Sequence, residues 1–125
     1  MATLRIAPAA KRDLELILSW THENFGERIR RSYESLIVQA LSDIADNPDR
    51  TGSQRRKDIS SVARTYHLYF SRSNSRSRQL LIRQPRHFLL FRAVDDGLVE
   101  VARILHDSMD LQRHLPAEYR DKPEG

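Results

Sequence analysis

The chain has 125 residues, which is the length of one domain and enough to bury a core without disulfides. It contains no cysteine, which excludes a disulfide framework and thiolate chemistry, and no window approaches the roughly 18 apolar residues of a membrane span. We expect a soluble, cytoplasmic protein. Residues 50–92 hold 11 Lys and Arg against one acid, Asp58, whereas the rest of the chain has 10 basic and 16 acidic residues. This asymmetry predicts an acidic partner, nucleic acid or an acidic protein segment, although a solvated basic loop would look the same.

The N-terminal half predicts a short strand over 3–6 and two helices. The first helix spans 8–24 and begins at Pro8, where the missing N–H of proline costs nothing. The second spans 27–47 and carries the cleanest apolar stripe of the chain. The members of this stripe are Ile29, Tyr33, Leu36, Ile37, Ala40, Leu41 and Ile44. The short connection at Gly26 predicts an antiparallel helical hairpin whose apolar face covers the strands that follow.

The middle of the chain is basic and less regular. Residues 49–61 show no period and are predicted to form a loop, and 62–71 alternate well enough to predict a strand. The low-complexity run over 71–78 is expected to be flexible and to form a hairpin tip. A brief return strand over 79–84 is expected to end before Pro85.

The most informative stretch is a second hairpin, with strands over 87–94 and 98–105. Asp96-Gly97 lies between these two hydrophobic runs, and Gly97 can adopt the positive φ that such a turn needs. Both strands are apolar on both faces, which is typical of central strands covered on both sides.

The C-terminal end predicts a short helix over 108–115, with Asp107 as its cap. We expect a single domain over 1–116 and a flexible tail over 117–125. The predicted class is α+β in the order β-α-α-β-β-β, with the helical hairpin packed on a small, mainly antiparallel sheet.

Several short motifs, taken in their order and spacing, resemble a known family. They are Phe25-Gly26, Asn47-Pro48, Tyr66-His67-Leu68, Arg86-His87-Phe88-Leu89, Arg103-Ile104-Leu105-His106, Met109-Asp110 and Arg113-His114-Leu115-Pro116. Over roughly residues 3–116 the chain resembles the ParE branch of the ParE/RelE superfamily, the toxins of type II toxin–antitoxin systems. The resemblance implies a small α+β toxin that forms a heteromeric complex with a cognate ParD-like antitoxin. ParE relatives poison DNA gyrase, whereas RelE relatives share the fold and cleave messenger RNA on the ribosome.

A ribonuclease needs a proton-transfer group and cations that stabilise the charged phosphate. The candidate set is Arg92, Arg103 and His106, with His106 as the acid–base residue. The alternative is that His106 is a half-buried residue at a strand end, bonded to a backbone carbonyl. We favour this alternative, and with it a toxin that has no catalytic residues and acts by protein–protein contact.

The predicted partner-binding residues are one aromatic side chain and six cations: Trp20, Arg55, Arg56, Arg64, Arg86, Arg92 and Arg103. Trp20 lies just off the apolar stripe of the first helix, so it is either a core residue or an exposed anchor for a partner. Tyr66 and Tyr69, beside arginines, are either packed under the helices or available to stack on bases. The five histidines show no metal-ligand spacing, and the four glycines form no phosphate loop, so we expect no metal and no cofactor.

Overall fold

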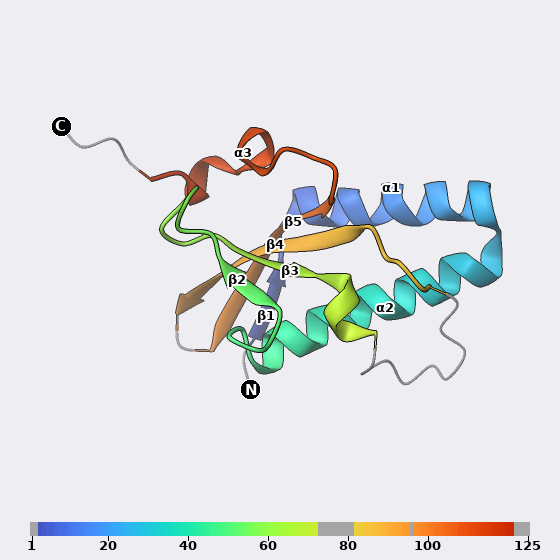
Figure 1. The fold of residues 1–125 in the computed structure, drawn as a ribbon, viewed down its shortest axis with the longest axis horizontal. Coiled ribbons are helices and arrows are strands. Elements are labelled where there is room, and N and C mark those ends of the chain that lie inside the picture. Colours follow the sequence, from blue (N-terminus) through green and yellow to red (C-terminus); the bar gives the residue numbers. More distant parts are fainter. Residues whose placement is uncertain (1–2, 73–81, 96, 122–125) are drawn as a thin grey trace.

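The computed structural model describes residues 3–72, 82–95 and 97–121 (Figure 1). In chain order its elements are β1 (Thr3–Ile6), α1 (Pro8–Phe25), α2 (Glu27–Asp46), β2 (Ser53–Arg55), β3 (Arg64–His67), the 3-10 turn η1 (Leu68–Ser71), β4 (His87–Asp95), β5 (Leu98–His106), α3 (Leu111–His114) and the 3-10 turn η2 (Ala117–Tyr119). The predicted α+β class is confirmed. The order differs from the prediction by one additional strand, β2.

The five strands form one mixed sheet in the order β1-β5-β4-β3-β2. β1 runs parallel to β5, and the other neighbouring pairs are antiparallel, as predicted for a mainly antiparallel sheet. The hairpin of β4 and β5 pairs from Asp95 opposite Leu98 to His87 opposite His106. Gly97 has a φ of +88°, which confirms the predicted turn.

The helical hairpin covers one face of this sheet. Gly26 ends α1 and starts α2 with a φ of +89°, a conformation that other residues rarely adopt. The buried residues of α2 are Tyr33, Leu36, Ile37, Ala40, Leu41, Asp43 and Ile44. All of them except Asp43 pack on side chains of β3, β4 and β5, namely Tyr66, Leu89, Phe91, Val99, Val101 and Ile104. The predicted placement of the hairpin on the sheet is therefore confirmed.

The C-terminal segment covers the opposite face of β4 and β5, so that α2 and α3 lie on opposite sides of the strands in Figure 1. Its core contains Ala63, Leu90, Ala102, Leu105, Leu111, Leu115 and Tyr119. Tyr119 is 1% exposed, and its hydroxyl donates to the backbone oxygen of Glu100 at 3.2 Å. The prediction of a flexible tail is wrong for residues 117–121, because the Tyr119 ring completes this second core; residues 122–125 lie outside the described chain.

The middle of the chain differs most from its prediction. β2 lies within the predicted loop over 49–61, because its polar residues pair through their backbone with β3. The strand predicted over 62–71 is confined to Arg64–His67. The Nδ1 atom of His67 accepts the N–H of Tyr69 at 3.1 Å, and the chain turns there into η1.

Two smaller predictions also change. The return strand predicted over 79–84 is absent from its described part, since residue 82 is irregular and residues 83–84 form a bend. Residues 79–81 and the tip over 73–78 lie outside the described chain. The short C-terminal helix is capped by Asp110 rather than Asp107, because the Asp110 carboxylate accepts the N–H of Gln112 at 3.1 Å.

Candidate functional site

Three large apolar side chains are exposed on α1, from its middle to its last residue. Leu16 is 70% exposed, Trp20 57% and Phe25 60%. Leu16 and Trp20 are one helical turn apart and share a face of α1. The rings of Trp20 and Phe25 meet edge to face with their centroids 5.7 Å apart. Trp20 is therefore exposed rather than a core residue, and we call Leu16, Trp20 and Phe25 the apolar ridge.

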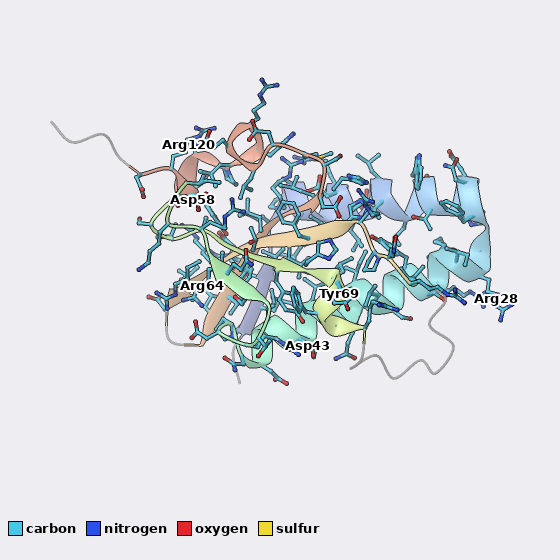
Figure 2. The ribbon with its side chains drawn as sticks, in the orientation of Figure 1. Arg28, Asp43, Asp58, Arg64, Tyr69 and Arg120 are labelled. Atoms are coloured by element: carbon cyan, nitrogen blue, oxygen red, sulfur yellow. The ribbon has the colours of Figure 1, made fainter. Side chains whose placement is uncertain are left out.

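The six predicted partner-binding arginines do not form one free basic surface. Every one of them forms an ion pair with a carboxylate. The pairs are Arg55–Asp49, Arg56–Asp58, Arg64–Asp49, Arg86–Asp107, Arg92–Glu100 and Arg103–Asp13. Except for Asp58, these carboxylates come from outside the basic segment over 50–92, so the fold neutralises much of the charge that the segment carries. Figure 2 labels Arg64, on β3, and Asp58, in the turn between β2 and β3.

Arg103 has a structural partner that explains its place in the middle of a strand. Its guanidinium donates twice to the Asp13 carboxylate, from Nε at 2.7 Å and from Nη2 at 3.0 Å. The same carboxylate accepts the backbone N–H of Ile104 at 2.9 Å. β1 ends opposite Val101, so Asp13 of α1 satisfies a β5 donor that has no neighbouring strand. The bond to Asp13 raises the pKa of Arg103, which is held as a permanent cation at this position.

Arg92 of β4 is likewise engaged by a carboxylate, that of Glu100 near the start of β5. Its Nε donates to Glu100 at 3.0 Å, and its guanidinium lies 4.8 Å from the centre of the Tyr119 ring. Burial raises the pKa of Glu100, but the pairs with Arg5 and Arg92 outweigh it and lower that pKa overall. Arg92 thus fixes the C-terminal segment to the sheet.

A histidine cluster lies where β4 begins and β5 ends, and Tyr33 of α2 contacts it. His87 and His106 face each other with ring centroids 5.2 Å apart. The Tyr33 hydroxyl accepts the N–H of Arg86 at 3.2 Å and is hydrogen-bonded to Nδ1 of His87 at 2.6 Å. Burial, with a smaller contribution from the charge of His106, lowers the pKa of His87 to about 4, so this imidazole is neutral at pH 7. Burial likewise raises the pKa of Tyr33 to about 12.

His67 and Asp107 form a second arrangement on the other face of the same strand ends. Nδ1 of His67 accepts a backbone N–H, so its Nε2 carries the proton and donates to Asp107 at 3.1 Å. Arg86 binds the second oxygen of Asp107 at 3.0 Å. Burial raises the pKa of Asp107, but His67 and Arg86 together lower it. The imidazole is therefore oriented by a carboxylate that remains ionised.

The candidate ribonuclease set is not assembled. Arg92 lies opposite Glu100 in the register, whereas His106 lies opposite His87, five residues away along β4. At about 3.3 Å per residue this separates Arg92 from His106 by roughly 17 Å. Arg103 is nearer in the chain but is engaged by Asp13. Nδ1 of His106 is occupied by the hydroxyl and the N–H of Ser108, at 2.7 and 3.1 Å, rather than by the expected backbone carbonyl.

Residues 4–111 match the family described as ParE toxin of type II toxin-antitoxin system, parDE. The chain belongs to this family. Comparison with curated proteins gives no match. Membership of the ParE toxin family implies a cognate antitoxin with which the chain forms a complex.

Sequence reasoning did not bring the histidines of this ParE-family chain together, although a signal was present. His87 and His106 lie the same number of residues before and after the Asp96-Gly97 turn, so a regular hairpin pairs them. The two register shifts of the hairpin offset each other and leave this pairing unchanged. The roles of Tyr33 and His67 depend on tertiary packing. Within the described ranges, no group of three or more His, Cys, Asp or Glu is placed to hold a metal ion. Across those same residues, no helix has both the length and the apolar character needed to cross a membrane.

Proposed function

We propose that this ParE-family chain is a toxin that poisons DNA gyrase by protein–protein contact and is neutralised by a ParD-like antitoxin. The observation that carries the proposal is the apolar ridge. Exposed large apolar side chains that adjoin each other on a soluble domain mark an interaction surface, and tryptophan is the residue most favoured as a binding hot spot. The ridge gives an amphipathic antitoxin segment an anchoring site.

The arginines contribute to this proposal in two different ways. Arg92 and Arg103 hold the fold together, so their removal acts through stability. Arg55 and Arg86 have side chains 61% and 59% exposed, and they can exchange their carboxylate partners for an acidic residue of the antitoxin. Exposed pairs of this kind add little affinity but raise the rate of association.

A RelE-like ribonuclease is the second candidate, and the disposition of Arg92, Arg103 and His106 supports it poorly. The same strand ends do carry His67, oriented by Asp107, and the neutral His87. Proton transfer to or from RNA by either imidazole would require the RNA to replace an existing partner, Asp107 at His67 or Tyr33 at His87. Protein–protein contact needs no such rearrangement.

The test compares Trp20→Ala with a matched control, Tyr69→Ala, an exposed aromatic of similar exposure (55%) on η1. We expect Trp20→Ala to weaken binding of the antitoxin encoded beside the toxin by about 30-fold, as hot-spot residues do, and Tyr69→Ala to weaken it far less. Calorimetry or surface plasmon resonance measures both. Equal losses in the two variants would contradict a role for the ridge.

The toxic mechanism is tested in cells that express the chain without antitoxin, by measuring the DNA damage response and the integrity of messenger RNA. We expect a DNA damage response with intact messenger RNA. Rapid messenger RNA decay without DNA damage would contradict gyrase poisoning and favour the ribonuclease.

A further inference from the structure

A groove lies on the face of β2 and β3 that is turned away from α2. It is lined by Gly52, Gln54, Arg56, Thr65, His67, Phe70 and Phe88. Gln54 and Thr65 are cross-strand partners, as are His67 and Phe88, so these four side chains share one face of the sheet. The groove has a volume of about 170 Å³, below the ~300 Å³ at which pockets begin to enclose small-molecule ligands. It therefore suits one flat group of an extended ligand rather than a whole metabolite.

Two neighbouring aromatic rings, with an arginine at each end, extend outward from this groove. Arg56 and Phe70 both line it. The Phe70 ring meets the Tyr69 ring edge to face at 5.7 Å, and the Arg72 guanidinium lies 5.4 Å from the centre of the Tyr69 ring. Tyr69 is 55% and Phe70 39% exposed. Figure 2 shows Tyr69 on η1, outside the sheet. We call Arg56, Phe70, Tyr69 and Arg72 the aromatic row.

The row is held in place by the backbone. In η1 the eclipsed residues Leu68 and Ser71 are buried, which directs Tyr69 and Phe70 outward. The Phe70 ring lies against Gly52, where a Cβ atom would overlap it. Gly52 also has a φ of +100°. Two exposed aromatics are thus fixed with little conformational freedom left to lose on binding.

We propose that the groove and the aromatic row bind a single-stranded segment of nucleic acid. Every base has a flat face that can stack on Phe70 or Tyr69 whatever the sequence, and the arginines at both ends of the row match the backbone phosphates. The Gln54 amide and the Thr65 hydroxyl offer donors and acceptors to a base edge. An acidic peptide would use the two arginines but would leave the exposed rings without partners, so nucleic acid is the better match.

The charge of the site fits a weak and exchangeable phosphate contact. The carboxylate that faces Arg56 is Asp58, whose side chain is 63% exposed. An exposed ion pair contributes little, so phosphate can replace Asp58. Arg72 donates to the backbone oxygen of Ile82 at 3.2 Å and keeps its charge for a ligand. Two phosphate contacts on a single strand predict a slope of about −1.4 in log affinity against log salt, or a roughly sevenfold loss between 50 and 200 mM salt.

The experiment measures fluorescence anisotropy of labelled oligo-dT and oligo-rU, each about 12 nucleotides long, with the purified full chain free of antitoxin. Phe70→Leu keeps an apolar group against Gly52 but removes the ring. We expect it to weaken oligonucleotide binding by about 5- to 150-fold, the value of one base stack. Phe25→Leu makes the same change at an exposed ring of the apolar ridge, and we expect it to leave binding unchanged. The dT and rU arms distinguish a DNA ligand from an RNA ligand.

Arg56→Gln is expected to reduce the salt slope by about 0.7. Duplex DNA of equal length and polyglutamate serve as competitors, and we expect neither to displace the single strand efficiently. Absence of binding at 50 mM salt would overturn the proposal. The proposal would also be overturned if Phe70→Leu and Phe25→Leu weakened oligonucleotide binding equally. It would likewise be overturned if polyglutamate displaced the labelled strand as effectively as unlabelled oligonucleotide does. Circular dichroism confirms that each variant is folded.

Discussion

His87 couples the stability of this fold to pH in the range where histidine ordinarily titrates. Its pKa is lowered from 6.5 to about 4 in the folded state, chiefly by burial. Between these values the unfolded chain binds a proton that the folded chain rejects, so acid favours unfolding. The contribution is fully present above pH 6.5 and is lost as the pH falls to about 4. A shift of this size corresponds to about 3 kcal/mol of unfolding free energy.

The perturbation is His87→Gln, which removes the titrating group while its amide oxygen can still accept from the Tyr33 hydroxyl. Urea unfolding followed by far-UV circular dichroism at pH 4.5, 5.5, 6.5 and 7.5 measures the free energy of unfolding; fluorescence is a poor probe because Trp20 is exposed. We expect the parent to lose about 2–3 kcal/mol across this range and His87→Gln to lose much less. The carboxylates with lowered pKa values, such as Asp107 and Glu100, act mainly below this window.

His22→Gln is the matched control, because His22 lies on the exposed side of α1 with its side chain 53% exposed. It should keep the pH dependence of the parent. If His87→Gln and the parent lost stability equally between pH 6.5 and 4.5, the assignment of a buried neutral imidazole would be refuted.

Three further changes test the fold. Leu36→Ala at a fully buried position between α2 and the sheet should cost about 2–5 kcal/mol in urea unfolding, and an unchanged midpoint would contradict the packing. Asp13→Asn should cost about 1–3 kcal/mol and speed hydrogen exchange of the Ile104 amide, whereas unchanged exchange would show that Asp13 does not satisfy this donor. Ending the chain after Pro116 removes Tyr119 from the second core and should lower the melting temperature by several degrees; a melting temperature equal to that of the parent would restore the flexible tail.

Local patterns predicted the parts of the fold that depend on local physics. The turn at Gly97 and the apolar stripe of α2 each depend on residues that are close together in the sequence. The predicted bounds of α2 and the position of the turn agree with the structure to within one residue. The sequence does not predict β2, because Ser53–Arg55 has no apolar pattern and only the pairing with β3 defines this strand. The strand predicted over 62–71 is longer than β3, because Leu68 and Phe70 continue the apolar alternation although the chain turns into η1 after His67.

The candidate site was predicted less well, because its properties depend on contacts between distant residues. The sequence shows the basic segment, but carboxylates that pair with it come from strand β5 and the residue after it, namely Glu100 and Asp107. Trp20 lies at the margin of the apolar stripe of α1, and this position in the sequence does not decide whether its side chain is buried or exposed. Proline and charged residues surround Tyr119 in the sequence and predict a tail, whereas its ring is buried in the second core.

In the proposed function, the toxin acts on gyrase and needs no proton-transfer residue. The most direct measurement is cleavage of supercoiled DNA by purified gyrase in the presence of the parent toxin or of folded His106→Gln. We predict that both proteins increase cleaved DNA to a similar extent and that the antitoxin abolishes the effect. Gyrase poisoning would be contradicted if the parent caused no increase in cleaved DNA and instead cleaved messenger RNA on ribosomes, with His106→Gln lowering that cleavage by about 10²–10⁴-fold.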